Sequence, residues 1–295
     1  TSDMKGFLAV VLALIPTFLS MKRVKPVHLA FSFDEEVNCT GVPFLINYLK
    51  EKGFKADGCL IGEPTNMTVY TGNKGLCVWE VKVHGKAIHS SMALMNTSCN
   101  AIEYAAQIIT KIREIALDIK NNGKRSQHDC PFGCITTGLI KGGNAVNTVP
   151  AECDFTFSVR LLDDQVIKDI EKQVGHYVAQ TILPAMQEEY PEAAVDCVQV
   201  AMYPAFDADE RDTFTTSARR LCHDDKIRKT GGGTEAGFFQ DVLHIPTVIV
   251  GPGQVETAHV ANECVCVDKM EECAKMVVDL IALYENSDRT KAAAL

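Results

Sequence analysis

The sequence predicts an α/β domain with a mostly parallel central sheet, interrupted by a ferredoxin-like α+β insert. Three observations support this prediction. Short apolar runs alternate with helical patterns at the start of the chain, strand-like alternation takes over in its middle, and α/β texture returns towards its end. We therefore expect one α/β domain in two parts, residues 1–69 and 204–295, with residues 70–203 forming the insert.

In the first part, helical and extended patterns follow one another, as crossover connections between parallel strands require. The expected elements are a helix over 5–20, a strand over 27–33, a helix over 41–52 closed by Gly53, and a strand over 58–62. Ligands of such sheets bind beyond the carboxyl ends of the strands. Glu35, Glu36 and Glu63 fall at that edge.

The insert has a clear half-exposed strand over 153–161, in which apolar residues alternate with polar ones. The other expected elements are a strand over 76–83, a helix through 102–115, a helix near 163–186 and a strand over 195–202. This order indicates the β-α-β-β-α-β arrangement of a ferredoxin-like domain.

The last part is expected to contain a helix over 214–222, a glycine-rich turn at 231–236, a strand over 246–250 and a final helix. Asp268, with Glu271 three residues later, is the expected N-cap of that final helix.

The composition argues against nucleic-acid binding and membrane association. The net charge of −9 and the lack of a dense Lys/Arg stripe argue against a nucleic-acid partner. The apolar run near the start is too short to span a bilayer, so no membrane association is expected. The twelve cysteines are interpreted as free thiols of a reducing compartment, which favours a cytoplasmic protein. The close pairs, Cys130 with Cys134 and Cys264 with Cys266, lack zinc-ribbon spacing.

The acids at the expected sheet edge indicate metal or acid/base chemistry, because carboxylates packed together without cations raise one another's pKa values. Asp3 precedes a helix and could be only an N-terminal cap. Together with Glu36, Glu63 and His259 it would supply three carboxylates and one imidazole, hard ligands that suit a bridged pair of zinc, cobalt or manganese ions. The alternative is that these acids are solvated helix starts.

Five segments carry a family resemblance, in order, along nearly the whole chain. They are Thr1–Gly6, Asp34–Val37, Ile61–Thr65, His84–Ser91 and Gly231–His259. Together they resemble the dinuclear metallo-aminoacylase and carboxypeptidase family, which includes acetylornithine deacetylase, succinyl-diaminopimelate desuccinylase and glutamate-type carboxypeptidases. The segments look most like the acetylornithine deacetylase members. The resemblance implies a metallopeptidase-like catalytic domain with the insert as a dimerisation domain.

The resemblance also implies roles for individual residues. Asp3 would bridge two divalent metal ions, zinc in the first instance with cobalt or manganese as alternatives. Glu36 and His259 would bind one ion, Glu63 the other, and Glu35 would be the general base.

The resemblance assigns the remaining candidates to catalysis or substrate binding. His89 would cross a dimer interface to stabilise the oxyanion in the partner's site, and Asn147 and Arg160 would meet the polar groups or carboxylate of the substrate. Gly232 and Thr234 would lie in a turn that approaches the substrate. The alternatives are a surface histidine, a turn asparagine, an exposed strand arginine and a flexible glycine loop.

The implied reaction is hydrolysis of the N-acyl amide of a small amino acid, with N-acetylornithine giving ornithine and acetate for arginine biosynthesis, in a homodimer built through residues 70–203. A succinyl-diaminopimelate desuccinylase and a broader N-acyl-amino-acid hydrolase remain alternatives. The family has a further histidine ligand upstream of the segment at which this sequence begins. Two hypotheses therefore stay open: an amidohydrolase active when upstream residues are present, and a truncated, non-catalytic dimerising paralogue.

Overall fold

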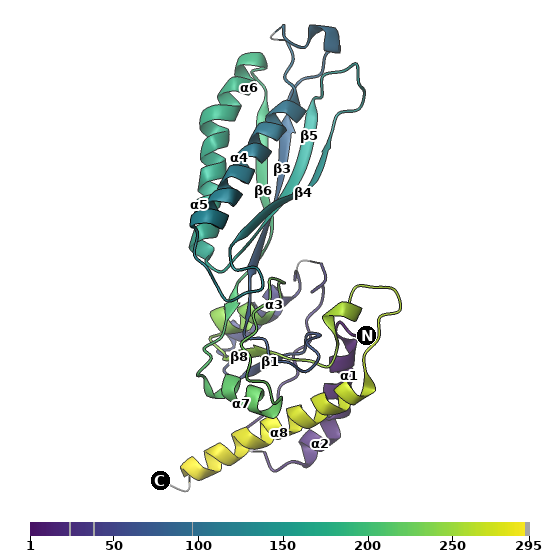
Figure 1. Cartoon of the computed structure of the whole chain (residues 1–295), viewed down its shortest axis with the longest axis vertical. Coiled ribbons are helices and arrows are strands. Elements are labelled where there is room, and N and C mark those ends of the chain that lie inside the picture. Colours follow the sequence, from purple (N-terminus) through teal and green to yellow (C-terminus); the bar gives the residue numbers. More distant parts are fainter. Residues whose placement is uncertain (24, 38, 96, 293–295) are drawn as a thin grey trace. The chain divides into compact units, whose positions relative to one another are not determined.

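The computed structural model describes residues 1–23, 25–37, 39–95 and 97–292. The chain divides into two compact units (Figure 1). Unit 1 comprises Thr1–Asn73 and Phe206–Leu295, and unit 2 comprises Lys74–Ala205. Unit 2 is therefore inserted into unit 1 along the sequence.

The centre of unit 1 is a pair of parallel strands, β1 (Cys59–Ile61) and β8 (Thr247–Ile249). A second, antiparallel pair is formed by β2 (Gly72–Asn73) and β7 (Phe206–Asp207). The helices of this unit are α1 (Lys5–Ala13), α2 (Ile15–Ser20), α3 (Val42–Glu51), α7 (Thr213–Leu221) and α8 (Val267–Ala292). Short helical turns occur at η3 (Phe238–Val242) and η4 (Val255–Thr257). Helices α1 and α7 both pack against α8.

The core of unit 1 is formed by apolar side chains of these helices and strands. Phe7 of α1, Phe214 of α7, Val248 of β8 and Met276 of α8 are all buried in one cluster. Fully burying an aliphatic or aromatic side chain of this size contributes about 1.5–3 kcal/mol. Packing of the helices on β1 and β8 therefore fixes the ends of these strands, where the candidate site lies.

The single helix predicted over 5–20 is divided in the structure at Leu14, between α1 and α2. Pro16 lies in the first turn of α2. Proline has no backbone N–H and its ring clashes with the preceding turn, so it is tolerated at a helix start and not in a helix interior. The sequence pattern gave the correct extent and missed this break.

The strand predicted over 27–33 is not formed. This segment is extended, but it makes no strand pairing within the described part of the chain. A strand requires a neighbouring backbone to accept and donate its hydrogen bonds, which the apolar pattern of the segment cannot show. The prediction of two strands delivering acids to one edge is therefore correct only for the strand that precedes Glu63.

Unit 2 contains a four-stranded antiparallel sheet in the order β4-β5-β3-β6. Its strands are β3 (Gly75–His84), β4 (Cys134–Gly142), β5 (Glu152–Leu161) and β6 (Ala194–Tyr203). Its helices are α4 (Ala101–Asn122), α5 (Asp164–Tyr177) and α6 (Leu183–Glu189), with a short turn η1 (Ser90–Met92). Figure 1 shows the helices covering one face of the sheet. This is the predicted β-α-β-β-α-β order.

The helices and sheet of unit 2 enclose a separate core. Trp79 and Phe157 are each 1% exposed, and their rings stack with centroids 5.0 Å apart. The alternation seen in the sequence over 153–161 matches the burial of β5, whose apolar residues face α4 and α5. Between α5 and α6 the helix widens into a π-helical turn, η2 (Val178–Ile182), just before Pro184. The proline cannot donate to the preceding turn, which explains the irregularity there.

Two further expectations can be compared with the structure. No helix within the described ranges has the length and apolar character needed to cross a membrane. All twelve cysteines, every one of them among the described residues, are free thiols.

Candidate metal centre

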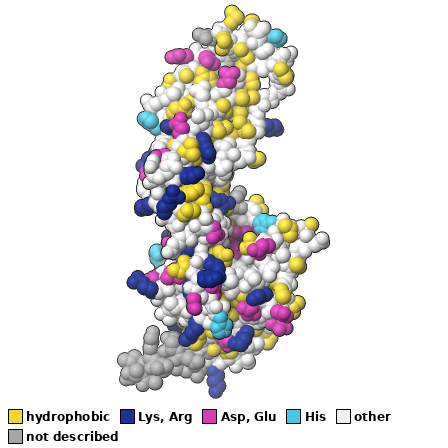
Figure 2. Space-filling model, in the orientation of Figure 1, with side chains coloured by type: hydrophobic (Ala, Val, Ile, Leu, Met, Phe, Trp, Pro, Cys, Tyr) yellow, Lys and Arg dark blue, Asp and Glu magenta, His cyan; other side chains and the backbone are white. Residues whose placement is uncertain are grey.

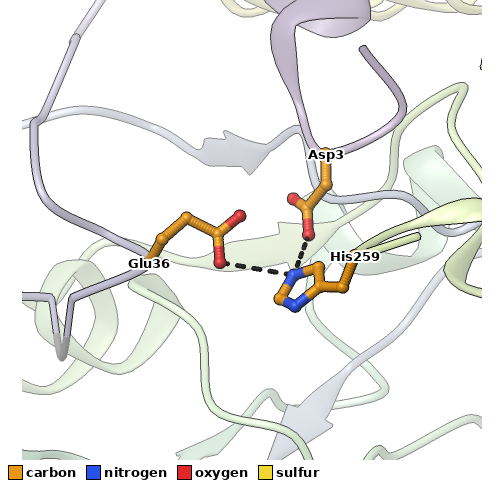
Figure 3. A group of neighbouring side chains, drawn as sticks. All are labelled: Asp3, Glu36 and His259. Atoms are coloured by element: carbon orange, nitrogen blue, oxygen red, sulfur yellow. Dashed lines mark hydrogen bonds and ion pairs between the residues drawn. The ribbon is translucent and has the colours of Figure 1, made fainter. Parts of the chain in front are cut away.

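Asp3, Glu36 and His259 converge in unit 1, as Figure 3 shows. The Nε2 atom of His259 lies 2.9 Å from Oδ2 of Asp3 and 3.3 Å from Oε2 of Glu36. One ligand atom from each residue lies within 4.8 Å of the other two. The hydrogen bond to Asp3 and the charge of Glu36 raise the pKa of His259 above its ordinary value. These three side chains are the predicted ligands of one metal ion.

Hydrogen bonds between distant loops hold Asp3 and His259 in place. The buried Ser2 hydroxyl donates to the carbonyl of Gln254 and accepts from the Gln254 N–H. The Glu263 carboxylate accepts from the backbone N–H groups of Asp3 and His259 at 3.0 and 3.3 Å. His259 itself has a φ of 58°, a left-handed conformation that is uncommon outside glycine. The surrounding contacts therefore fix a backbone position that His259 would not adopt readily alone.

Glu63 reaches the cluster from the end of β1. Its position depends on the close approach of the loop after β8, because a Cβ atom on Gly251 would lie 2.3 Å from the carbonyl oxygen of Gly62 and 2.5 Å from that of Glu63. Only glycine allows two backbones this near each other. The carboxyl ends of two parallel strands thus bring Glu63 and the 251–259 loop together, as predicted for this edge of the sheet.

Asp3 contacts both halves of the predicted ligand set. Its carboxylate accepts from or pairs with His259 on one side, and it shares a hydrogen bond with the Glu63 carboxyl on the other. Burial, the charges of Glu35 and Asp3, and this hydrogen bond raise the pKa of Glu63 well above its ordinary value. The position of Asp3 between His259 and Glu63 is the arrangement that a bridging carboxylate requires.

Glu35 lies beside this group and is half-buried. Burial, followed by the charges of Glu36, Glu235 and Asp3, raises the pKa of Glu35 to about 7. The Cys39 thiol donates to Glu35 Oε1 at 3.6 Å and opposes this rise. A carboxyl group with a pKa near neutrality can both take up and release a proton, as a general acid/base must.

The donor set fits divalent metal ions. Five carboxyl groups and one imidazole occupy one region of unit 1: Asp3, Glu35, Glu36, Glu63, Glu235 and His259. Such a concentration of acids is costly unless cations compensate it. Oxygen and imidazole ligands at this spacing suit zinc, cobalt or manganese. All five acids also line a largely apolar cavity of about 730 Å³ in unit 1, within the size range of small-molecule sites.

His89 and Asn147 lie together in unit 2. The segments that carry them are joined by hydrogen bonds from Ser90 N–H to the Asn147 carbonyl (2.9 Å) and from Val149 N–H to the Ile88 carbonyl (2.8 Å). The exposed His89 ring contacts the Ser91 hydroxyl through Nδ1 at 2.8 Å. Two residues predicted separately are therefore neighbours.

Arg160 lies at the other end of the same sheet. It is opposite Leu76 of β3 and Cys134 of β4, whereas Glu152, at the His89 end, is opposite His84. Arg160 is eight positions along β5 from Glu152, about 26 Å at the usual rise per residue. Within unit 2, Arg160 is therefore not brought together with His89 and Asn147.

The glycine-rich turn is held partly by its own hydrogen bonds. The buried Thr234 hydroxyl donates to Oδ1 of Asn73 at 2.9 Å and accepts from the Ala236 N–H. The Gly232 N–H donates to the Thr230 hydroxyl at 3.1 Å. The Thr234 hydroxyl is thus used to fix the turn. Gly232 has open space around it, since a Cβ added there would lie no nearer than 3.5 Å to another atom.

Sequence reasoning missed two acids of the site. Glu263 fixes the backbone of Asp3 and His259, and Glu235 lies near Glu35 and accepts a hydrogen bond from the Ser32 hydroxyl at 2.8 Å. Burial raises the pKa of Glu235 despite that hydrogen bond. In the sequence, Glu235 could have been noticed because it follows the predicted Thr234. Glu263 could have been noticed only because it lies four residues after His259.

Comparison with known proteins agrees with this geometry. A family model described as peptidase family M20/M25/M40 matches residues 1–283. Acetylornithine deacetylase of Aliivibrio salmonicida is 27% identical over 267 residues, which cover 89% of this chain and 66% of that protein. The acetylornithine deacetylase of Vibrio parahaemolyticus is 26% identical over 285 residues, covering 96% and 72%. This chain thus spans about two thirds of the length of these relatives.

Solved structures show a similar fold. The aminopeptidase PepT of Bacillus cereus has a TM-score of 0.73 at 19% identity, covering 95% of this chain and 70% of that one. The di-peptidase Dug1p of Saccharomyces cerevisiae has a TM-score of 0.65 at 14% identity, covering 96% and 71%. At these identities the likeness concerns the fold alone. The family resemblance inferred from the five sequence segments is confirmed by the family match.

Proposed function

Because the chain belongs to peptidase family M20/M25/M40, we propose that it is a metal-dependent amidohydrolase that removes the acyl group from an N-acyl amino acid. The finer proposal is that N-acetylornithine is the substrate and that ornithine and acetate are the products. The observation that supports a two-metal site most strongly is the position of Asp3, in contact with His259 on one side and Glu63 on the other.

In this proposal Asp3 would hold two divalent ions, Glu36 and His259 would bind one of them, and Glu63 would bind the other. Zinc is the first choice, and cobalt or manganese would suit the same oxygen and imidazole ligands. When bound, such ions polarise the amide carbonyl and make an attacking water more acidic. They would also offset the mutual repulsion of the clustered carboxylates.

Glu35 is proposed to move the proton. Its carboxylate takes a proton from the attacking water, and the resulting acid gives that proton to the nitrogen of the departing amine. Burial, the largest cause of its raised pKa, favours the protonated form of Glu35 that the second step uses. Cys39, whose thiol donates to Glu35, would help to hold the carboxylate in position.

His89 and Asn147 are proposed to act in the site of a partner copy, in a homodimer formed through unit 2. Both lie at the end of the unit 2 sheet remote from Lys74 and Ala205, where the chain enters and leaves the unit. Among the described strands, the outer strand β4 has a neighbour on one side only, and it exposes Leu139 and Ile140. Figure 2 shows further hydrophobic side chains on the surface of unit 2. Such an edge strand is a suitable surface for a symmetric partner.

Substrate contacts are proposed for Arg160, Gly232 and Thr234. The Arg160 guanidinium would bind the substrate carboxylate through paired hydrogen bonds. Gly232 would allow the turn to approach the substrate closely, because glycine has no side chain to keep the substrate away from its backbone. The hydroxyl of Thr234 is used to fix the turn, so its contribution would be to position the backbone.

The proposal is tested by hydrolysis of N-acetylornithine, N-succinyl-diaminopimelate and a dipeptide by a version of the chain extended upstream to the length of its relatives. We expect N-acetylornithine to have the highest kcat/KM. Glu35→Gln should lower turnover by about 10²- to 10⁴-fold, the usual contribution of a positioned acid/base, and keep the metal. Glu114→Gln on the surface of α4 is the matched control. Full activity of Glu35→Gln would contradict the role of Glu35, and preference for another substrate would replace the finer proposal.

A further inference from the structure

Two cysteine thiols of unit 2 lie in contact and play no part in the proposed hydrolysis. The Sγ atoms of Cys130 and Cys134 are 3.3 Å apart, and both residues are partly exposed. Cys134 is the first residue of β4, and Cys130 lies in the loop that leads into it. Three residues separate the cysteines, so the chain between them can close a small ring without moving the rest of the sheet.

The loop carrying these thiols is held in a defined conformation. The Ser126 N–H donates to the Pro131 carbonyl at 2.9 Å, and a Cβ on Gly133 would lie 1.9 Å from the Leu161 side chain. Both thiols donate to the carbonyl of Phe132, at 3.6 and 3.7 Å. The two sulfur atoms are therefore directed to one point.

The surroundings of the two sulfur atoms are positively charged. The Lys74 side chain is almost fully buried, donates to the Phe132 carbonyl and forms a hydrogen bond with Cys130. Arg160 lies opposite Cys134 in the ladder between β4 and β5. Lys120 and Arg125 lie over the Phe132 ring, 5.7 and 5.2 Å from its centroid. Cationic neighbours of this kind stabilise a thiolate and make it reactive.

The two thiols differ in their tendency to ionise. Burial opposes ionisation of Cys130, but the hydrogen bonds that its sulfur receives from Cys134 and Lys74, with the charge of Lys74, lower the pKa of Cys130. Burial and the hydrogen bond with Cys130 raise the pKa of Cys134. Cys130 is thus suited to attack an oxidant, and Cys134 is suited to attack the oxidised Cys130 afterwards.

We propose that Cys130 and Cys134 form a reversible thiol–disulfide site, with Cys130 as the attacking sulfur and Cys134 as the resolving sulfur, oxidised by a small peroxide. The Cys130 thiolate attacks one oxygen of hydrogen peroxide, the O–O bond breaks, and the released hydroxide takes up a proton to become water. The Cys134 sulfur then attacks the sulfenic sulfur of Cys130. The S–O bond breaks, and the leaving hydroxide takes the Cys134 proton as a second water. Both sulfurs are oxidised, peroxide is reduced, and a dithiol reverses the reaction.

The test of this site measures chemistry at the two sulfur atoms and does not depend on hydrolytic activity. The full chain is reduced, freed of reductant, treated with hydrogen peroxide and alkylated with N-ethylmaleimide, and its peptides are analysed by mass spectrometry. We expect the segment 130–134 to lose two hydrogen atoms, to escape alkylation and to recover both thiols with dithiothreitol. The exposed pair Cys264 and Cys266 is the internal control and should react at least about tenfold more slowly. Oxidation of both pairs at the same rate, or of Cys130 to a sulfinic acid without a cross-link, would overturn the proposal.

The role of Lys74 is tested by the rate at which iodoacetamide alkylates Cys130 at pH 7. Lys74→Met should slow alkylation by about tenfold, since removal of one adjacent charge shifts a thiol pKa by roughly one unit. Lys120→Met, which changes a charge over the Phe132 ring, should change the rate by less than about twofold. Circular dichroism establishes that each variant is folded. An unchanged alkylation rate in folded Lys74→Met would overturn the activation of Cys130 by Lys74. If that variant does not fold, the peroxide experiment on the unaltered chain still shows whether Cys130 and Cys134 form a disulfide.

Discussion

The imidazole of His259 lies 2.9 Å from the carboxylate of Asp3, although the two residues are 256 positions apart in the sequence. Their contact is supported by Glu263, which accepts hydrogen bonds from both backbones, and by Ser2, which joins the first loop to Gln254. The first and last parts of unit 1 thus build one face of the candidate metal centre.

Loss of the imidazole should weaken metal binding. We expect His259→Gln to bind zinc at least about tenfold more weakly, since even residues that only orient a ligand contribute that much. The measurement is isothermal titration of the metal-free protein with zinc. His176→Gln, an exposed histidine of α5, serves as control and should leave the affinity unchanged. Equal affinities of the two variants would exclude His259 as a ligand.

Gly251 should be required for the position of Glu63. In Gly251→Ala the new Cβ would meet the carbonyl oxygens of Gly62 and Glu63, so the loop must shift away from β1. We expect both a lower unfolding midpoint and weaker zinc binding. Gly231→Ala, where an added Cβ has no neighbour within 4 Å, should retain both properties. A variant Gly251→Ala that binds zinc normally would show that the close approach does not position the acid.

The buried Asp224 should make the stability of unit 1 depend on pH. Burial alone would raise its pKa, but hydrogen bonds from Arg228 and from the N–H groups of Val69 and Lys226 outweigh burial and hold the pKa below its ordinary 3.8. The folded state therefore binds this proton less readily than the unfolded state. The stabilisation is complete above about pH 4 and is lost as the pH falls through the folded-state pKa.

The corresponding variant is Asp224→Asn, which leaves Arg228 without its charged partner. We expect a loss of roughly 2–4 kcal/mol in the free energy of unfolding at pH 7, and a smaller difference from the unaltered protein below pH 4. Denaturant titrations across this pH range measure both. The neighbouring exposed Asp225→Asn should change stability by less than about 0.5 kcal/mol. A constant difference between Asp224→Asn and the unaltered protein at every pH would contradict the assignment.

Mixed dimers should reveal whether His89 acts in the partner's site. In the upstream-extended protein, His89→Ala and Glu35→Gln should each be nearly inactive alone. After unfolding and refolding together, half of the dimers would contain one chain of each kind, with one intact site per mixed dimer. We expect recovery of about a quarter of the unaltered activity. No recovery, with mixed dimers demonstrated by mass, would contradict action across the interface.

Much of the fold was accessible from sequence patterns that report burial. The alternation over 153–161 predicted β5, and the helical pattern through 102–115 predicted α4, because each pattern reflects one buried face. The prediction of a strand over 27–33 was wrong for a related reason. The segment is apolar and extended, but apolar side chains do not show whether a neighbouring backbone is present to pair with it. The final helix begins at Val267, one residue before Asp268, which was the expected N-cap. Differences of one or two residues are usual at helix ends.

The candidate site was only partly accessible. Asp3, Glu36 and His259 were found through family segments, and the structure brings their side chains together. Glu263 and Glu235 were missed because their roles depend on which backbones and carboxyl groups lie near them in space. The contact between Cys130 and Cys134 was missed because their spacing was judged against zinc ribbons and not against the loop geometry that directs both thiols to Phe132.

The central claim, a two-metal amidohydrolase centred on Asp3, is tested most directly by metal content per chain measured together with N-acetylornithine hydrolysis. Both measurements are made on this chain and on the version extended upstream to the length of its relatives. We predict two metal ions per chain and turnover in the extended version, with both properties lost in its Asp3→Ala variant. Absence of bound metal and of turnover in the folded, extended protein would contradict the claim and favour a non-catalytic role for the chain.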